Sequence, residues 1–345
     1  MRPLLSPRGL ACRQLALVAL LLAGCATVPV RRVGEVREGD PWWPREEGRR
    51  IAYVGELRTP EHLGIERGFW ASVWAFLTGE DETTSLYRPT GVALAEDGRL
   101  AVADPGRRSV RVYSPRGQAH LKLQGALRYP VALAFVGDLL VVADAETASL
   151  HGFDAQGAAV RLAWDLPPFG RPAGLAVDLA RRRLLVSDVV QHCVHVVSLD
   201  GEPPRRFGTR GEGPGEFNFP GALAVDAKGQ VYVNDALNFR VQVFSSELAP
   251  VLAFGGPGDG PGSLSRAKGL AVDADGVIYV VEGYFDVIQA FDGQGQLLGV
   301  FGGNGTGPGR FWLPAGAAID DRHRLYVADT WNERVQVFAL DRRAP

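Results

Sequence analysis

Short segments in which apolar and polar residues alternate fill most of the chain after residue 85. Within residues 221–245, the segments GALAVD, QVYVND and RVQVFS each place small or branched apolar residues at every second position. A period of two residues is typical of a half-buried β-strand, so this stretch predicts at least three short strands. The segments APVLAFGG, QLLGVFGG and PPRRFG suggest a fourth strand before the next copy begins.

The same set of segments recurs along the chain. Copies aligned on a Pro-x-Gly turn and a later Val-x-Asp begin near Arg88, Tyr129, Arg171, Phe219, Arg266 and Leu313. The later copies lie about 47 residues apart, within the range of propeller blades. Pro-x-Gly-Leu-Ala-Val-Asp, Tyr-Val-Ala-Asp and Asn-x-Arg-Val-Gln-Val-Phe resemble the NHL repeat family of β-propellers over residues 87–340. The resemblance implies a ring of blades about a channel, with the first strand of each blade innermost, but no particular activity.

Two segments outside the repeats complete the predicted fold. Residues 50–57 (RIAYVGEL) predict a strand, and the sixth copy lacks its fourth strand, so we expect this strand to close the ring in the last blade. Residues 58–86 predict a short helical insertion with an apolar stripe that begins at Ile65 and Phe69. This helix is expected to cap the propeller, with partner docking or a membrane interface as alternatives. The predicted fold is all-β, a six-bladed NHL-type β-propeller over residues 87–343.

The amino terminus predicts export and lipid anchoring. Residues 1–24 combine arginines with the apolar run LALVALLLAG, which is typical of a secretory signal peptide. LAGC, ending at Cys25, resembles a bacterial lipobox, which implies cleavage before Cys25 and acylation of its thiol. The alternative is an ordinary signal peptide. Residues 25–49 read as a polar tether, and Ala26 resembles an outer-membrane sorting signal. We therefore expect an extracytoplasmic, lipid-anchored protein of the bacterial outer membrane. RIAYVGELRTPEHLG, followed by FW, also resembles the amino-terminal region of a group of bacterial six-bladed NHL lipoproteins.

The charge and the cysteine content of the chain limit the binding partners and the disulfides that we expect. The formal net charge is −2, and removal of the three arginines of the signal peptide makes it −5. Lys and Arg are scattered along the chain, so we do not expect a nucleic-acid partner. Besides Cys25, only Cys193 lies beyond the signal peptide, so an intrachain disulfide between propeller residues is not expected. Cys193 is predicted to pack as a small hydrophobic side chain.

Every copy carries an acid at the same position after its second predicted strand: Asp104, Asp144, Asp188, Asp235, Glu282 and Asp329. An acid at this position predicts a turn cap that accepts backbone N–H groups. Because all copies keep it, a structural role explains the pattern better than one metal site does. Glu282 departs from the others, so it is the candidate metal ligand of an alternative hypothesis.

The residue before each turn predicts a ring of side chains at the channel mouth. Its candidate ligand-binding members are Arg88, Tyr129, Arg171, Phe219 and Arg266, and Tyr284 and Trp331 extend the same mouth. Arginines interleaved with aromatic residues favour an anionic ligand held by charge-assisted hydrogen bonds. The alternative is that the arginines pair with the acids of the repeats or cover strand edges.

These features favour a lipid-anchored, non-enzymatic binding or scaffold module without a cofactor, which binds a protein or an anionic ligand in the cell envelope. The alternative is a metal-dependent hydrolase or lactonase that uses calcium in the channel. Propeller lactonases gather Glu, Asn and Asp there, and Glu282, Asn234, Asn238 and Asn332 are available in this chain. The sequence contains no Gly-x-Ser-x-Gly elbow or other nucleophile and base pair that predicts a hydrolase.

Overall fold

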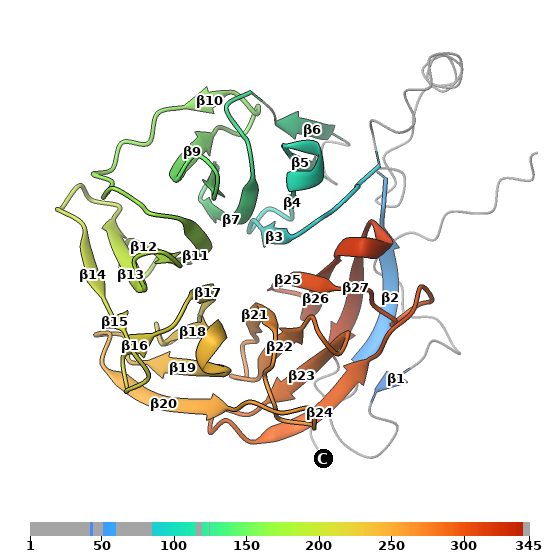
Figure 1. The fold of residues 1–345 in the computed structure, drawn as a ribbon. Coiled ribbons are helices and arrows are strands. Elements are labelled where there is room, and N and C mark those ends of the chain that lie inside the picture. The colour runs from blue at the N-terminus through green and yellow to red at the C-terminus, as the bar shows by residue number, and fades with distance from the viewer. Residues whose placement is uncertain (1–41, 44–50, 60–84, 115–118, 124, 341–345) are drawn as a thin grey trace, which may run out of the picture. The chain divides into compact units, whose positions relative to one another are not determined.

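A computed structural model describes residues 42–43, 51–59, 85–114, 119–123 and 125–340. They belong to one compact unit, residues 32–345. Their strands form six antiparallel sheets arranged in a ring, with β3 near the start of the ring and β27 near its end (Figure 1). The fold is therefore an all-β six-bladed β-propeller, which confirms the prediction made from the repeats.

The first three blades each contain four strands in chain order, and the first strand of each blade is innermost (Figure 1). Blade 1 consists of β3 (Gly91–Leu94), β4 (Leu100–Asp104), β5 (Ser109–Ser114) and β6 (Ala119–Leu123). Blade 2 consists of β7 (Pro130–Val136), β8 (Leu139–Asp144), β9 (Ser149–Phe153) and β10 (Ala159–Val160). Blade 3 consists of β11 (Pro172–Asp178), β12 (Arg183–Asp188), β13 (Cys193–Ser198) and β14 (Arg205–Phe207).

The second half of the ring follows the same order. Blade 4 consists of β17 (Pro220–Val225), β18 (Val231–Asp235), β19 (Arg240–Phe244) and β20 (Pro250–Gly255). Blade 5 consists of β21 (Ala267–Val272), β22 (Ile278–Glu282), β23 (Val287–Phe291) and β24 (Leu297–Gly302). Blade 6 consists of β25 (Pro314–Ile319), β26 (Arg324–Asp329), β27 (Arg334–Leu340), β2 (Ile51–Leu57) and β1 (Trp42–Trp43).

Smaller elements occupy links and turns. Between blades 3 and 4, β15 (Thr209–Arg210) pairs in parallel with β16 (Glu216–Phe217). Three single-turn 3-10 helices follow the second strands of blades 1, 4 and 6: η2 (Pro105–Arg107), η3 (Ala236–Asn238) and η4 (Thr330–Asn332). Each therefore begins directly after the acid that the repeat places at the end of the second strand.

The last blade combines strands from the two ends of the described chain. β2 pairs antiparallel with β27, from Ile51 opposite Leu340 to Leu57 opposite Val335. β2 thus lies where the fourth strand lies in the other blades, and its pairing covers the edge of β27. β1, which falls in the predicted tether, pairs in turn with β2.

The hydrophobic core is divided among the interfaces between neighbouring blades. Between blades 5 and 6, for example, Tyr279 and Ile288 pack in one cluster with Phe311 and Phe338. Each of these side chains is at most 4% exposed. Because strand residues alternate between the two faces of a sheet and both faces meet a neighbouring blade, the apolar positions of the repeat supply every interface.

Close contact between innermost strands depends on glycine in four blades. A Cβ atom at Gly269 would lie 2.2 Å from the carbonyl oxygen of Ala315 in the next blade. The same near-collision with a backbone oxygen of the next blade, at 2.4–2.6 Å, would occur at Gly91, Gly174 and Gly316. The glycine of the Pro-x-Gly pattern therefore lets adjacent blades approach each other around the channel.

Several predictions made from the sequence fall on residues that the structure does not describe. These are the signal peptide (1–24), Cys25, most of the tether (25–49) and the apolar stripe of the helical insertion (58–86). Among the described residues, no helix combines the length and apolar character needed to cross a membrane.

Candidate functional site

The acid at the end of each second strand fixes the residue that begins the innermost strand. Asp144 Oδ2 accepts the backbone N–H groups of Arg128 and Tyr129, at 2.6 and 2.9 Å. Its Oδ1 accepts those of Glu146 and Thr147, both at 3.0 Å. Backbone N–H groups are likewise accepted in the other blades by Asp104, Asp188, Asp235, Glu282 and Asp329. All six acids are 0% exposed, so they act as buried turn caps.

In blades 4 and 6 a side-chain network surrounds this acid. Asp329 Oδ2 accepts hydrogen bonds from Arg334 Nε at 2.7 Å and from Asn332 Nδ2 and Gln336 Nε2, both at 2.9 Å. Blade 4 repeats the arrangement with Asp235, Asn238, Arg240 and Gln242. The sequence analysis missed this network, although its signal is the Asn, Arg and Gln at the third, fifth and seventh positions after the acid.

Blade 3 has Cys193 and His195 in place of the arginine and glutamine. His195 Nε2 lies 3.8 Å from Asp188 Oδ2 and 3.6 Å from Cys193 Sγ. Both contacts use one ring nitrogen, whereas a catalytic triad needs the acid and the nucleophile on different nitrogens. Burial, together with the charge of Asp188, raises the pKa of the Cys193 thiol to about 11. The thiol is therefore neutral at pH 7, and Cys193 packs as a small buried side chain, 1% exposed.

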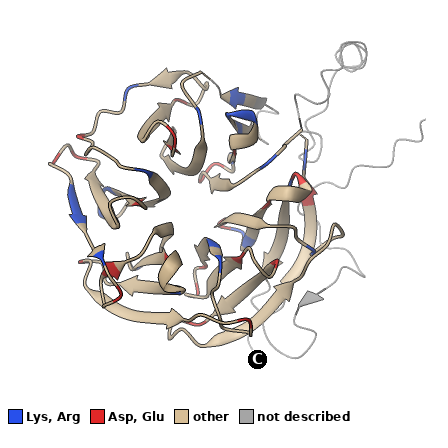
Figure 2. Cartoon of the chain, viewed as in Figure 1, with Lys and Arg blue, Asp and Glu red and all other residues tan. Residues whose placement is uncertain are grey.

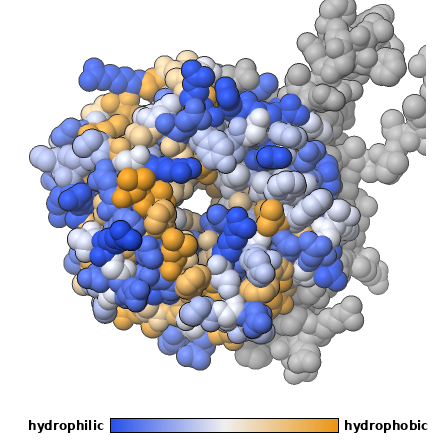
Figure 3. All heavy atoms as spheres, viewed as in Figure 1, coloured by the Kyte–Doolittle hydropathy of each residue, from blue (hydrophilic) through white to orange (hydrophobic). Residues whose placement is uncertain are grey.

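Five of the predicted mouth residues line one cavity at an end of the channel. The cavity has a volume of about 600 Å³, and its wall includes Tyr129, Arg171, Phe219, Arg266 and Trp331. These residues lie at the starts of the innermost strands or just after the ring acid. Figure 3 shows the opening at the centre of the ring, bordered by both hydrophobic and hydrophilic residues. We call this cavity the cationic mouth.

The remaining two predicted mouth residues lie outside its wall. The Arg88 guanidinium stacks over the rings of Trp331 and Tyr87, at 4.8 and 5.3 Å from their centroids. Arg88 therefore contacts Trp331, a residue of the cavity wall, but does not line the cavity itself. Tyr284 is 65% exposed and packs edge-on against Phe285. Its ring is available at the surface of blade 5 rather than in the cavity.

The wall of the cationic mouth carries positive charge without a carboxylate. Arg171, Arg266 and Lys268 line it, and no Asp or Glu of the described ranges does. Figure 2 shows basic residues at the inner ends of β11 and β21. Desolvation lowers the pKa of Lys268, and Arg266 lowers it further, while Glu282 acts in the opposite direction. No side-chain ion pair of Arg171 or Arg266 is found within the described part of the chain, but the charges of Arg266 and Lys268 oppose the rise that burial causes in the pKa of the ring acid Glu282.

Two polar atoms deeper in the same cavity complete its chemistry. Thr90 Oγ1 and Asn234 Oδ1 are buried and have no hydrogen-bond partner among the described residues. Asn234 is held in place because its Nδ2 donates to the carbonyl oxygen of Ala267 at 2.8 Å. Buried polar atoms are nearly always satisfied, so each of these two would need a bound water as its partner.

Glu282 does not assemble a cation site. Its Oε2 accepts the N–H of Arg266 at 2.9 Å, and its Oε1 accepts that of Tyr284 at 3.0 Å. Burial raises the pKa of Glu282, and these hydrogen bonds oppose the rise. Asn238 and Asn332 donate to the acids of their own blades instead. The described residues contain no group of three or more His, Cys, Asp or Glu that could hold a metal ion.

The fold and the repeat define the class of protein. It is a six-bladed β-propeller, and the NHL repeat model matches residues 311–338, which lie in blade 6. No curated protein matches the chain.

Solved structures with the same fold have diverse activities. A gluconolactonase from Xanthomonas campestris is 18% identical, with 74% of this chain and 87% of that one covered, at a TM-score of 0.58. An auxiliary nutrient binding protein from Bacteroides thetaiotaomicron is 11% identical, with 74% and 70% covered, at 0.60. A virginiamycin B lyase from Staphylococcus aureus is 11% identical, with 85% and 100% covered, at 0.56. At these identities the similarity establishes the fold and leaves function to the site.

Proposed function

We propose that this propeller is a non-enzymatic binding module that holds an anionic ligand, or an acidic group of a protein partner, in the cationic mouth. One observation carries the proposal: Arg171, Arg266 and Lys268 line one cavity, and none of the described residues in its wall is an acid. A bound carboxylate or phosphate would relieve the repulsion between these cations and accept their hydrogen bonds. Tyr129, Phe219 and Trp331 would cover apolar parts of the same ligand.

The metal-dependent hydrolase remains a weaker alternative. It is supported by fold similarity to the gluconolactonase alone. Glu282 binds backbone N–H groups and gathers no second acid or histidine among the described residues, so no specific contact favours this alternative.

Anion binding tests the proposed function. We expect benzene-1,3,5-tricarboxylate, which combines negative charge with an aromatic ring, to bind the full-length chain in isothermal titration calorimetry. Arg266→Ala should weaken this binding about tenfold to a hundredfold, because hydrogen bonds between charged groups contribute about 1.5–3 kcal/mol. Arg322→Ala is the matched control, since Arg322 is an exposed arginine that does not line the cavity. Equal affinities of wild type and Arg266→Ala would contradict the proposal.

We further propose that Cys25 anchors the propeller to the outer membrane. This anchor would hold the cationic mouth close to a partner in the cell envelope. The lipobox LAGC, the apolar run before it and the polar segment after it support this. When the chain is expressed in a bacterium with radiolabelled palmitate, we expect label on the wild type and none on Cys25→Ser. The label should fractionate with the outer membrane. Equal labelling of both chains would exclude Cys25 as the acylated residue.

A further inference from the structure

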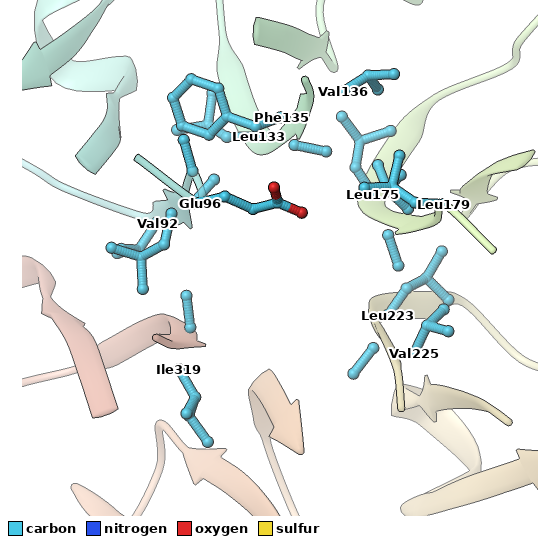
Figure 4. Close-up of a pocket in the computed structure, with 18 of the residues that line it drawn as sticks. Val92, Glu96, Leu133, Phe135, Val136, Leu175, Leu179, Leu223, Val225 and Ile319 are labelled. Carbon is cyan, nitrogen blue, oxygen red and sulfur yellow. The ribbon is translucent and has the colours of Figure 1, made fainter. Parts of the chain in front are cut away.

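The opposite end of the channel contains a second, larger cavity of different chemistry. It lies where the innermost strands end and has a volume of about 810 Å³. Most of the residues in its wall are apolar, among them Val92, Leu133, Leu175, Leu223 and Ile319 (Figure 4), while polar atoms contribute about as much of the exposed wall as apolar atoms do. A cavity of this size and composition is suitable for a small organic ligand.

One carboxylate points into this apolar cavity. In Figure 4 the side chain of Glu96, just after β3, extends from the wall toward the centre of the cavity. No hydrogen bond or ion pair of this side chain is found within the described part of the chain.

The basic residues of the wall are already paired with acids. Arg99 Nε lies 2.7 Å from Asp97 Oδ2, and Arg99 Nη2 lies 2.7 Å from Asp138 Oδ1. Arg182 Nε forms an ion pair with Asp200 Oδ1 at 2.5 Å. The two basic residues of the cavity are therefore paired with other acids, and the exposed Glu96 carboxylate adds a negative charge at the cavity.

We propose that this cavity is a second binding site, which takes a primary ammonium ligand with an apolar body. The aliphatic wall would bury the hydrocarbon part, and the Glu96 carboxylate would accept hydrogen bonds from the ammonium group. Recognition of a quaternary ammonium usually depends on open aromatic faces. Here Arg99 already lies 5.2 Å from the ring centroid of Phe135, which also lines the cavity, so the carboxylate is the better partner for a cation.

The two ends of the channel would thus select ligands of opposite charge. The cationic mouth presents Arg171, Arg266 and Lys268, whereas the second cavity presents Glu96 in an apolar wall. This inference does not depend on the proposed function, because no residue lines both cavities.

Binding of octylammonium tests the second site. In isothermal titration calorimetry with the full-length chain, we expect saturable binding of one octylammonium per chain. Glu96→Gln should weaken it about twofold to fivefold, because the variant keeps the shape of the side chain and removes the charge of an exposed carboxylate. Octanoate has the same chain length and the opposite charge. Its affinity for the wild type should be no higher than its affinity for Glu96→Gln.

Two further variants separate this site from other effects. Glu202→Gln removes an exposed carboxylate that does not line the cavity, and it should bind octylammonium as the wild type does. Arg266→Ala should also bind it unchanged, so failure of the cationic mouth and failure of this site are distinguishable. Equal octylammonium affinities of wild type and Glu96→Gln, or uptake of many molecules per chain without saturation, would overturn the proposal.

Discussion

Replacement of Arg334 by methionine is expected to lower the free energy of unfolding by about 3–5 kcal/mol, because it leaves a buried carboxylate without its cation. Arg334 is 2% exposed, and its Nε lies 2.7 Å from Asp329 Oδ2. Its guanidinium also contacts Glu56 of β2 and donates to the carbonyl oxygens of Gly307 and Arg310. One side chain therefore connects the ring acid, the closing strand and the link between blades 5 and 6. Urea denaturation of the full-length chain measures the loss.

The pH dependence of this loss identifies its cause. Burial raises the pKa of Asp329, while Trp312 N–H, Asn332 and Arg334 oppose the rise. Without Arg334 the pKa of Asp329 should rise further. A carboxyl group whose pKa is higher in the folded state than its unfolded value of about 4 destabilises the fold while it is ionised. Protonation removes this destabilisation as the pH falls through the folded-state pKa. The destabilisation by Arg334→Met should therefore be larger at pH 7 than at pH 5.

Arg240→Met in blade 4 is the matched control. Arg240 occupies the same repeat position and lies 2.8 Å from Asp235, but its side chain is 18% exposed. We expect a loss of about 1–3 kcal/mol, because water can partly replace the lost hydrogen bonds. Equal losses of unfolding free energy in the two variants, at pH 5 and at pH 7, would contradict this explanation. They would show that the greater burial of the blade 6 network does not account for its stability.

Gly269→Ala is expected to lower the free energy of unfolding by about 3 kcal/mol, at the upper end of the range for overpacked interiors. The new Cβ would lie 2.2 Å from the carbonyl oxygen of Ala315 and 3.0 Å from Val281 Cγ2. A backbone oxygen cannot rotate away as a flexible side chain does, so blade 5 or blade 6 must shift. Urea denaturation again measures the change.

Gly299→Ala provides the comparison within the same blade. Gly299 lies on β24, and a Cβ there would meet no atom within 4 Å. The substitution should be neutral or stabilise the fold by at most about 1 kcal/mol, because alanine restricts the unfolded chain more than glycine does. A loss at Gly269 no greater than that at Gly299 would show that the close approach of the blades is not needed.

Local patterns predicted much of the candidate site, and the exceptions have identifiable causes. Tyr129, Arg171 and Phe219 occupy one repeat position, so their common cavity could be anticipated. Ring acids accept the backbone N–H groups of Tyr129 and Arg171, whereas His192 accepts that of Phe219. Arg88 occupies the same repeat position in blade 1 but does not line the cavity, because its guanidinium stacks on Trp331 of blade 6. Tyr284 lies in a turn that has lost the Asn-x-Arg pattern and packs against its own neighbour, Phe285.

The sequence alone determined the strands, the number of blades and the capping role of the acids, because alternation and turn capping are local properties that recur in each copy. Only the tertiary structure decided which side chains share a cavity. Lys268, Thr90 and Asn234 join the cationic mouth, and Glu96 faces the other end, because ring closure brings residues of different blades together. Their convergence depends on how each blade is rotated against the next, and no single repeat contains that information.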